Sequence, residues 1–296
     1  MRLLGFGDNI VDRFLDRGLD YPGGNAVNVA VYARRAGAHA EYLGVFGDDE
    51  LGGFLRRAIE DAGVRTQRSV VRAGESGVSS LRVIDGDRVF QGWNGGGVTV
   101  RHPVDLEDGR EEYAASFDVV HSSVYSGTEA ELARLRRHDV LVSFDLSSEP
   151  DFRTPEYLDR IGPSADLVLL SCAGLEEDEA FALLDDAVRR GAGLALGTRG
   201  TDGALVTDGS LRAAAPAQLV PEGTPVVDTM GCGDAFLAGF LVELHGTGWR
   251  RGRPPGASGL RAGLEAGAWA ARDQCLVEGA FARGRPSTTP SAVGGR

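Results

Sequence analysis

The chain has 296 residues, of which 42% are apolar and 25% charged, a composition typical of a folded globular protein. Its net charge of −12 argues against binding to a nucleic-acid backbone, which depends on Lys and Arg, and favours a small-molecule ligand. All 31 Lys plus Arg residues are arginine, so lysine-dependent phosphate loops, protein-kinase ion pairs and Schiff bases are excluded.

Strand-length apolar runs alternate with helical patterns along most of the chain. The predicted strands are residues 3–7, 42–47, 118–121, 140–145, 167–171 and 194–198, and the predicted helices are 25–36, 51–62, 129–137 and 175–190. This rhythm is typical of successive strand-helix-strand units. It predicts an α/β fold, with a doubly wound, mainly parallel sheet covered by helices on both faces.

One stretch breaks this rhythm. Residues 78–84 and 88–92 alternate apolar and polar side chains on either side of Asp85 and Gly86, a pair that favours a tight hairpin turn. Two interpretations stay open for the hairpin, a lid over a binding site or an ordinary surface hairpin.

Polar residues cluster around the end of the first strand and the start of the first helix. They are Asp8, Asn9, Asp12, Gly24, Asn25 and Asn28. Carboxylates accept hydrogen bonds from paired hydroxyls, and amides both donate and accept them, so the cluster suits a sugar. The alternative is structural, with Asp8 and Asn25 as turn and cap residues.

Two glycine turns form the second candidate region. The turn with Thr198, Gly200 and Gly203 follows a predicted parallel strand, where ligands of open α/β sheets bind. Downstream of Val226 and Val227, which resemble a strand, residues 228–234 lead into an apolar helical pattern at 235–244. Free amides at a helix start can hold phosphate, and a carboxylate there can take a proton from an attacking alcohol.

The remaining reactive residues predict no metal centre or disulfide framework. Cys172, Cys232 and Cys275 are odd in number and widely spaced, and the five histidines form no ligand pattern. We therefore expect a reducing, cytoplasmic location, and the sequence contains no long apolar segment that predicts a membrane span. The acidic run at 176–179 is expected to be a solvated helix face, and it lies near enough to the strand end at Ser171 to help hold hydrated magnesium.

Taken together, two of these motifs resemble the signatures of the ribokinase-like, or PfkB, carbohydrate kinases. The first signature covers residues 23–30 and continues to 44–49, and the second covers 228–234. Within the family, residues 7–12, 24–32, 87–90 and 228–231 are most similar to fructoselysine 6-kinase. Cys232 stands where the family usually has alanine, and the family's Asn-x-x-Glu magnesium motif is not recognisable near residue 171.

The resemblance implies a role for each motif residue. Asp234 is expected to be the catalytic base, and the amides of Gly231, Cys232 and Gly233 to form an anion hole. ATP is expected to contact Thr198, Gly200, Gly203 and Asp228, with Mg²⁺ near Glu176 or Glu177 through water. The sugar is expected to contact Asp8, Asn9, Asp12, Gly24, Asn25, Asn28 and, from the lid, Arg88.

The expected enzyme transfers the γ-phosphoryl group of ATP to a primary hydroxyl of a ketose-type substrate, fructoselysine or a related fructosamine, at the 6-position. One alternative is a kinase of the same family for ribose, another hexose or a nucleoside, and another is a non-catalytic sugar-binding protein. The kinase domain is predicted at 1–281, its β lid at about 13–22 and 72–100, and a disordered tail at 282–296. A homodimer that pairs through the lid is also predicted.

Overall fold

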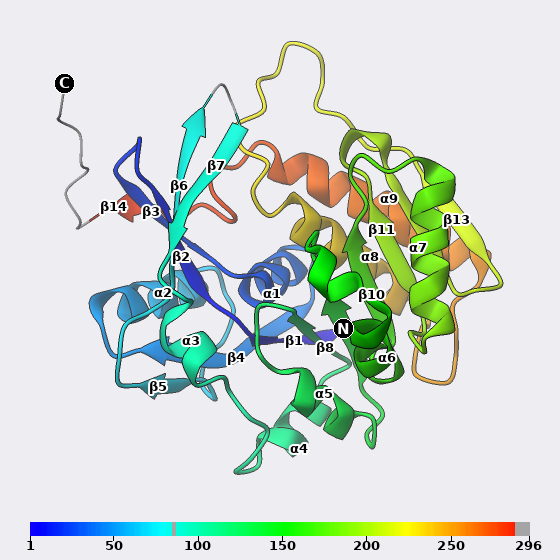
Figure 1. The fold of residues 1–296 in the computed structure, drawn as a ribbon, viewed down its shortest axis with the longest axis horizontal. Coiled ribbons are helices and arrows are strands. Elements are labelled where there is room, and N and C mark those ends of the chain that lie inside the picture. Colours follow the sequence, from blue (N-terminus) through cyan, green and yellow to red (C-terminus); the bar gives the residue numbers. More distant parts are fainter. Residues whose placement is uncertain (85–86, 288–296) are drawn as a thin grey trace.

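The computed structural model describes residues 1–84 and 87–287, without the side chains of residues 84, 87 and 88. A nine-stranded sheet in the order β13-β12-β11-β10-β9-β8-β1-β4-β5 forms its centre (Figure 1). In chain order these strands are β1 (Arg2–Gly7), β4 (His39–Gly47), β5 (Val70–Arg72), β8 (Val119–Ser123), β9 (Leu141–Asp145), β10 (Leu167–Ser171), β11 (Ala195–Thr198), β12 (Ala204–Thr207) and β13 (Arg212–Ala215). Only β12 and β13 run antiparallel to their neighbours in this sheet, which confirms the mainly parallel sheet.

Helices cover both faces of this sheet, as the apolar runs predict. Along β1, Leu3 packs into one buried core and Leu4 into another, because successive side chains of a strand point to opposite faces. The first core is closed by α1 (Asn25–Arg35), α2 (Glu50–Asp61), α8 (Cys232–Gly246) and α9 (Ala257–Gln274). The second is closed by α3 (Gly97–Arg101), α4 (Arg110–Ala115), α5 (Glu129–Leu135), α6 (Pro155–Ile161) and α7 (Glu177–Arg189).

A second, five-stranded sheet stands beside the first (Figure 1). Its order is β14-β3-β2-β6-β7, with β2 (Ile10–Phe14), β3 (Leu19–Gly23), β6 (Val78–Ile84), β7 (Asp87–Trp93) and β14 (Arg285–Pro286). Strands β6 and β7 pair antiparallel, so the predicted hairpin exists, while its turn at 85–86 lies outside the described residues. The predicted tail includes β14, which pairs with β3, and residues 288–296 also lie outside the description.

The segment before α8 differs from the prediction. Val226 and Val227 are 53% and 47% exposed and form no strand. The amide of Val227 donates instead to the carbonyl of Cys275 at the end of α9, at 2.8 Å. The strand prediction was therefore wrong. These two β-branched residues are held by a hydrogen bond to a helix end and not by a neighbouring strand. Helix α8 also begins three residues earlier than predicted, which places Asp234 in its first turn.

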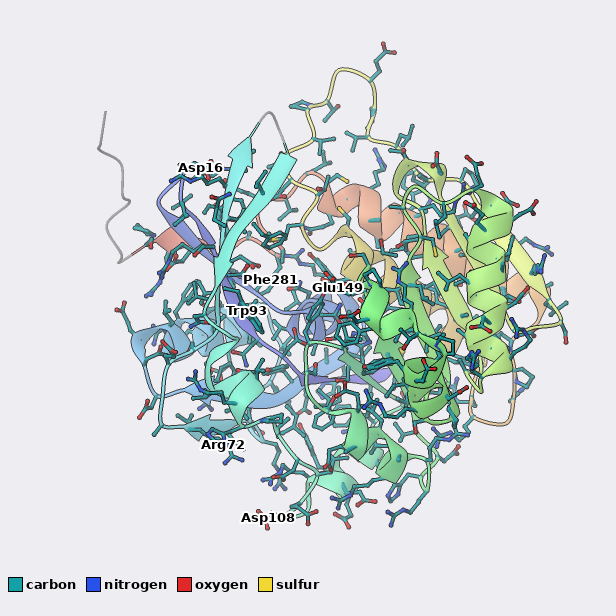
Figure 2. The ribbon with its side chains drawn as sticks, viewed as in Figure 1. Asp16, Arg72, Trp93, Asp108, Glu149 and Phe281 are labelled. Carbon is teal, nitrogen blue, oxygen red and sulfur yellow. The ribbon has the colours of Figure 1, made fainter. Side chains whose placement is uncertain are left out.

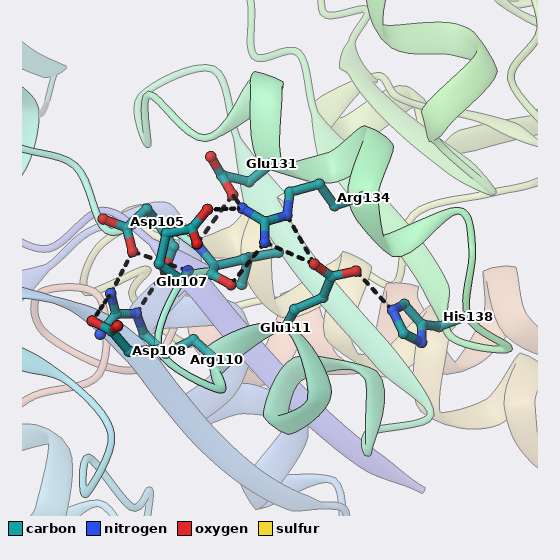
Figure 3. Close-up of polar contacts among 9 residues, drawn as sticks. Asp105, Glu107, Asp108, Arg110, Glu111, Glu131, Arg134 and His138 are labelled. Carbon is teal, nitrogen blue, oxygen red and sulfur yellow. Dashed lines mark hydrogen bonds and ion pairs between the residues drawn. The ribbon is translucent and has the colours of Figure 1, made fainter.

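An arginine-centred network joins α4 to α5 (Figure 3). Arg134 donates to Glu107 and Glu111, and His138 pairs with Glu111 at 2.9 Å. Ion pairs of partly exposed side chains at the surface each contribute little to stability. No member of the network lines the main cavity within the described residues, so we assign it a structural role. Among those same residues, no helix has the length and apolar character needed to cross a membrane.

Candidate active site

A cavity of ≈ 1330 Å³ lies between the two sheets, at the carboxyl ends of the central parallel strands. Trp93 of β7 borders it from the second sheet, and Glu149 borders it from the segment after β9 (Figure 2). The structure brings most of the predicted site residues to this one cavity: Asp8, Asn9, Asp12, Gly24, Asn25, Asn28, Thr198, Gly200, Gly203, Gly231, Cys232, Gly233 and Asp234. Motifs more than 200 residues apart in sequence therefore share one site.

Three of the predicted residues do not line this cavity. Asp228 is buried, and its carboxylate accepts from the amides of Met230 at 3.0 Å and Gly279 at 3.1 Å. The structure thus uses Asp228 to shape the turn before α8, while a contact with ATP stays a prediction. Glu176 and Glu177 lie at the start of α7, outside the cavity lining. The side chain of Arg88 lies outside the described residues.

The turn into α8 presents backbone amides to the cavity. Gly231 caps the helix in the left-handed region, with φ 75°, and a Cβ there would lie 2.3 Å from the hydroxyl of Tyr32. Only glycine fits this position. The amide of Cys232 turns back to the carbonyl of Thr229 at 3.3 Å. Gly233 and Asp234 both line the cavity. Because the first amides of a helix have no intrahelical acceptor, the amides of these two residues are available as donors for an anion.

The carboxylate of Asp234 is held by two amide side chains from α1. Asn25 donates to one carboxylate oxygen and Asn28 to the other, both at 2.7 Å. Burial, followed by the negative charge of Asp145, raises the pKa of Asp234 well above its usual value, while the hydrogen bond from Asn28 opposes that shift. A carboxylate with a raised pKa is a stronger proton acceptor, which suits a general base.

Asp145 is a site residue that the sequence analysis missed. It ends β9, lines the cavity and accepts from Asn25 at 2.6 Å and from the amide of Ser147 at 2.7 Å. Burial raises its pKa to about 6. A signal was present in the sequence, since Asp145 is the last residue of a predicted parallel strand, at the sheet edge where Asp8 also lies. The amide of Asn25 therefore joins the buried carboxylate of Asp145 to the partly buried carboxylate of Asp234.

His121 fixes the direction of the Asn25 amide. Its Nε2 lies 2.8 Å from Asn25 Oδ1, and its Nδ1 lies 3.1 Å from Ser143 Oγ. Burial lowers the pKa of His121 to about 3, so the ring is neutral at working pH. The two carboxylates can only accept, so Asn25 must direct its NH₂ group toward them and its oxygen toward His121. It follows that Nε2 carries the ring proton.

Asp8 holds the start of α1 rather than standing free in the cavity. Its carboxylate accepts from the amide of Asn25 at 2.6 Å and from that of Ala26 at 3.2 Å. The hydroxyls of Ser123 and Ser126 add bonds of 3.0 and 2.7 Å. Four donors fill the acceptor capacity of a carboxylate. The structure therefore favours the cap interpretation for Asp8, and a direct sugar contact stays a prediction.

Two amide oxygens in the cavity wall have no hydrogen-bond partner within the described part of the chain. Asn9 donates to the hydroxyl of Tyr42 and the carbonyl of Val45, both at 2.7 Å, which leaves its Oδ1 buried and unmatched. Asn28 Oδ1 is in the same situation. A buried acceptor without a donor costs free energy, so a hydrogen bond from water or from a ligand would stabilise each of these oxygens. Hydroxyl groups are the matching donors.

The charges around the cavity are strongly one-sided. Its carboxylate residues are Asp8, Asp12, Asp145, Glu149, Glu222 and Asp234. Arg272 is the single Lys or Arg among the described residues that line it. The cavity wall also contains Thr198, Gly200 and Gly203, whose turn follows β11.

The comparisons with known proteins agree with this geometry. Residues 16–274 match the family model described as pfkB family carbohydrate kinase. The chain is 35% identical over 243 residues to fructosamine kinase FrlD of Bacillus subtilis (strain 168), covering 82% of this chain and 83% of that one. It is 34% identical over 249 residues to fructoselysine 6-kinase of Escherichia coli (strain K12), covering 83% and 88%.

The fold is shared with a solved kinase structure. The aminoimidazole riboside kinase from Salmonella enterica, complexed with aminoimidazole riboside and an ATP analog, superposes with a TM-score of 0.70 at 22% identity, over 95% of both chains. The family match and the relatives together go beyond the fold. The chain is an ATP-dependent sugar kinase and belongs to the pfkB family of carbohydrate kinases.

Proposed function

We propose that this kinase phosphorylates the primary 6-hydroxyl of a ketose that carries an amine substituent, fructoselysine or a related fructosamine. The observation that carries the proposal is the acidic cavity, with six carboxylate residues against Arg272. The amine nitrogen of such a ketosamine is protonated near neutral pH, and an acidic wall attracts a cation. The two curated relatives, at 34 and 35% identity, support this choice of acceptor.

Asp234 is proposed as the base of the transfer step. It takes the proton of the acceptor hydroxyl while that oxygen bonds to the γ-phosphorus, and the bond to the β-phosphate oxygen breaks to release ADP. We propose the amides of Gly233 and Asp234, at the positive end of α8, as the donors that stabilise the negative charge on the transferring group. The predicted anion hole consisted of the amides of Gly231, Cys232 and Gly233. The Cys232 amide is bonded to the carbonyl of Thr229 at 3.3 Å instead, and a role for the Gly231 amide stays a prediction. Asn25 and Asn28 hold the carboxylate in place, through bonds of 2.7 Å each.

Sugar recognition is proposed for the unmatched acceptors. Asn9 Oδ1 and Asn28 Oδ1 would each receive a hydroxyl hydrogen of the sugar, which would satisfy two buried polar atoms. Asp12 of β2 is buried in the wall beside Gly23 and would accept from a further hydroxyl or from the ammonium group. Gly24, which is in the left-handed region with φ 114°, allows α1 to begin close to the sugar.

Magnesium is expected to accompany ATP, because it neutralises charge on the phosphates during transfer. The part of the chain that the structure describes contains no cluster of three His, Cys, Asp or Glu side chains suited to a metal. An ion held mainly by phosphates and water fits such a site. Glu176 forms a capping box with Glu179, and Glu177 lies 3.9 Å from Arg199. We propose Glu176 and Glu177 only as outer ligands, through water.

The β6-β7 hairpin is proposed both as a lid over the cavity and as the contact surface of a homodimer. The second sheet forms a cavity wall through Phe90 and Trp93, which supports a lid role for the β6-β7 hairpin, with Arg88 on it. Its edge strand β7 would provide the pairing surface of a homodimer. Light scattering that gives a monomer would contradict the homodimer.

A cytoplasmic location of the protein also stays a prediction.

The acceptor is tested by coupled ADP release with purified protein, ATP and Mg²⁺. The panel contains fructoselysine, a ketosamine acylated on its linking nitrogen, fructose, ribose and adenosine. The acylated compound keeps the sugar but loses the cation, so it is the matched control. We expect kcat/KM for fructoselysine to exceed every other value by at least about tenfold. A higher value for fructose, ribose or adenosine contradicts the acceptor, and melting shifts without phosphorylated product favour the non-catalytic alternative.

A further inference from the structure

Two cysteines meet beside the anion hole. The Sγ atoms of Cys232 and Cys275 lie 3.4 Å apart, although 43 positions separate them in sequence. Cys232 is the first residue of α8 and Cys275 caps the end of α9, two helices that pack against each other. Both line the cavity, whereas Cys172 is fully buried elsewhere in the second core.

The two sulfur atoms are in non-bonded contact. A disulfide has an S–S length of about 2.05 Å, so the two sulfurs need to approach by roughly 1.3 Å. Both residues are at helix ends and partly exposed. A small oxidant can reach them, because the cavity is open to the ligands of the kinase.

Hydrogen bonds already connect the end of α9 to the segment before α8. The carbonyl of Cys275 accepts from the amides of Val227 at 2.8 Å and Asp228 at 3.4 Å. Gln274 donates to the carbonyl of Met230 at 3.0 Å. The end of α9 therefore supports the whole turn that leads into the anion hole. A covalent link between the two residues would act directly on the amides at the start of α8.

We propose that Cys232 and Cys275 are a redox modification site, in which a reversible disulfide switches off phosphoryl transfer. The oxidant is a hydroperoxide. Because the start of α8 stabilises negative charge, the thiolate of Cys232 attacks one peroxide oxygen, the O–O bond breaks, and a sulfenic acid and water form. The thiolate of Cys275 then attacks that sulfur, the S–O bond breaks, and a second water leaves. Two thiols and one hydrogen peroxide thus give one disulfide and two waters, and a dithiol reductant reverses the change.

The disulfide would inhibit phosphoryl transfer by displacing groups at the start of α8. It would draw the side chain of Cys232 toward α9 and turn the first residue of α8, which shifts the amide of Gly233 and the carboxylate of Asp234 together. Loss of a single oxyanion donor costs about 100-fold to 1000-fold in turnover. We therefore expect the oxidised enzyme to lose at least about tenfold of its kcat.

The test compares the wild type with Cys275→Ser and Cys172→Ser, each measured before and after limiting hydrogen peroxide and again after dithiothreitol. Peptide mapping is expected to find residues 232 and 275 linked in the wild type and in Cys172→Ser, with kcat lowered in both and restored by reductant. Cys275→Ser is expected to form no link. After peroxide it should keep a several-fold larger fraction of the kcat that it had before peroxide than the wild type keeps.

Three results would overturn the switch. These are absence of the linked peptide, a linked peptide with unchanged kcat, or equal peroxide sensitivity in Cys275→Ser, which would assign inhibition to oxidation of Cys232 alone. The linked peptide is detected without any acceptor, so failure of the switch is distinguishable from a wrong acceptor.

Discussion

Replacing Asp145 by asparagine removes one of two carboxylates that share the amide of Asn25. The NH₂ group lies 2.6 Å from an oxygen of Asp145 and 2.7 Å from one of Asp234, and its two hydrogens point apart, so these oxygens are roughly 4–5 Å from each other. Two unit charges at that distance repel by roughly 3–4 kcal/mol at an effective dielectric of about 20. This energy corresponds to roughly two to three pKa units.

The charge of Asp145 raises the pKa of Asp234, so its removal lowers that pKa. A base must be deprotonated to act, and the acidic limb of kcat/KM against pH reports its pKa in the free enzyme. We expect Asp145→Asn to move this limb to lower pH by at least about one unit. Coupled ADP release between pH 5 and 9 measures the shift.

Glu149→Gln is the matched control for that experiment. It removes one negative charge from the same cavity, but Glu149 is exposed and is not among the groups that raise the pKa of Asp234. Its acidic limb is expected to stay in place. An unchanged limb in Asp145→Asn, or a shift to higher pH, would refute the coupling of the two carboxylates.

Two further substitutions test the supports of the site. His121→Leu removes the donor that holds Asn25, so kcat should fall by about tenfold. His121→Gln keeps a donor, so its kcat should lie closer to that of the wild type. Equal losses of kcat in both variants would contradict the positioning role. Gly231→Ala places a methyl 2.3 Å from the Tyr32 hydroxyl at φ 75°, so thermal melts should show destabilisation of about 1–3 kcal/mol. Gly233→Ala has open space around its Cβ and is the control; similar melting shifts in both would argue against that strain.

The fold was predictable because its signals are local and repeated. Buried parallel strands appear as short apolar runs, and α1 with its glycine start and the run before Asp145 both lie within one or two residues of the prediction. The segment before α8 was harder to predict. Val226 and Val227 have strand-like side chains, but the contact with Cys275 that holds them joins distant segments.

The site was predictable where a motif has a chemical reason within a few residues. The glycines and carboxylate of 231–234 are such a case. Asp145 and His121 act through Asn25, so their roles depend on which strands lie side by side at one sheet edge. Asp8 shows the converse. Its carboxylate, although part of a motif, accepts from four donors that belong to α1, to the last residue of β8 and to the segment after β8. Sequence spacing does not reveal such three-dimensional competition for a side chain.

The most direct measurement is turnover of Asp234→Asn. This variant keeps the approximate shape of the side chain but cannot accept the hydroxyl proton, and a thermal melt at pH 8 verifies that it is folded. We predict that kcat falls by at least about 100-fold, while calorimetry gives Kd values for ATP and the acceptor close to those of the wild type. Turnover within about tenfold of the wild type in a folded variant would contradict Asp234 as the base.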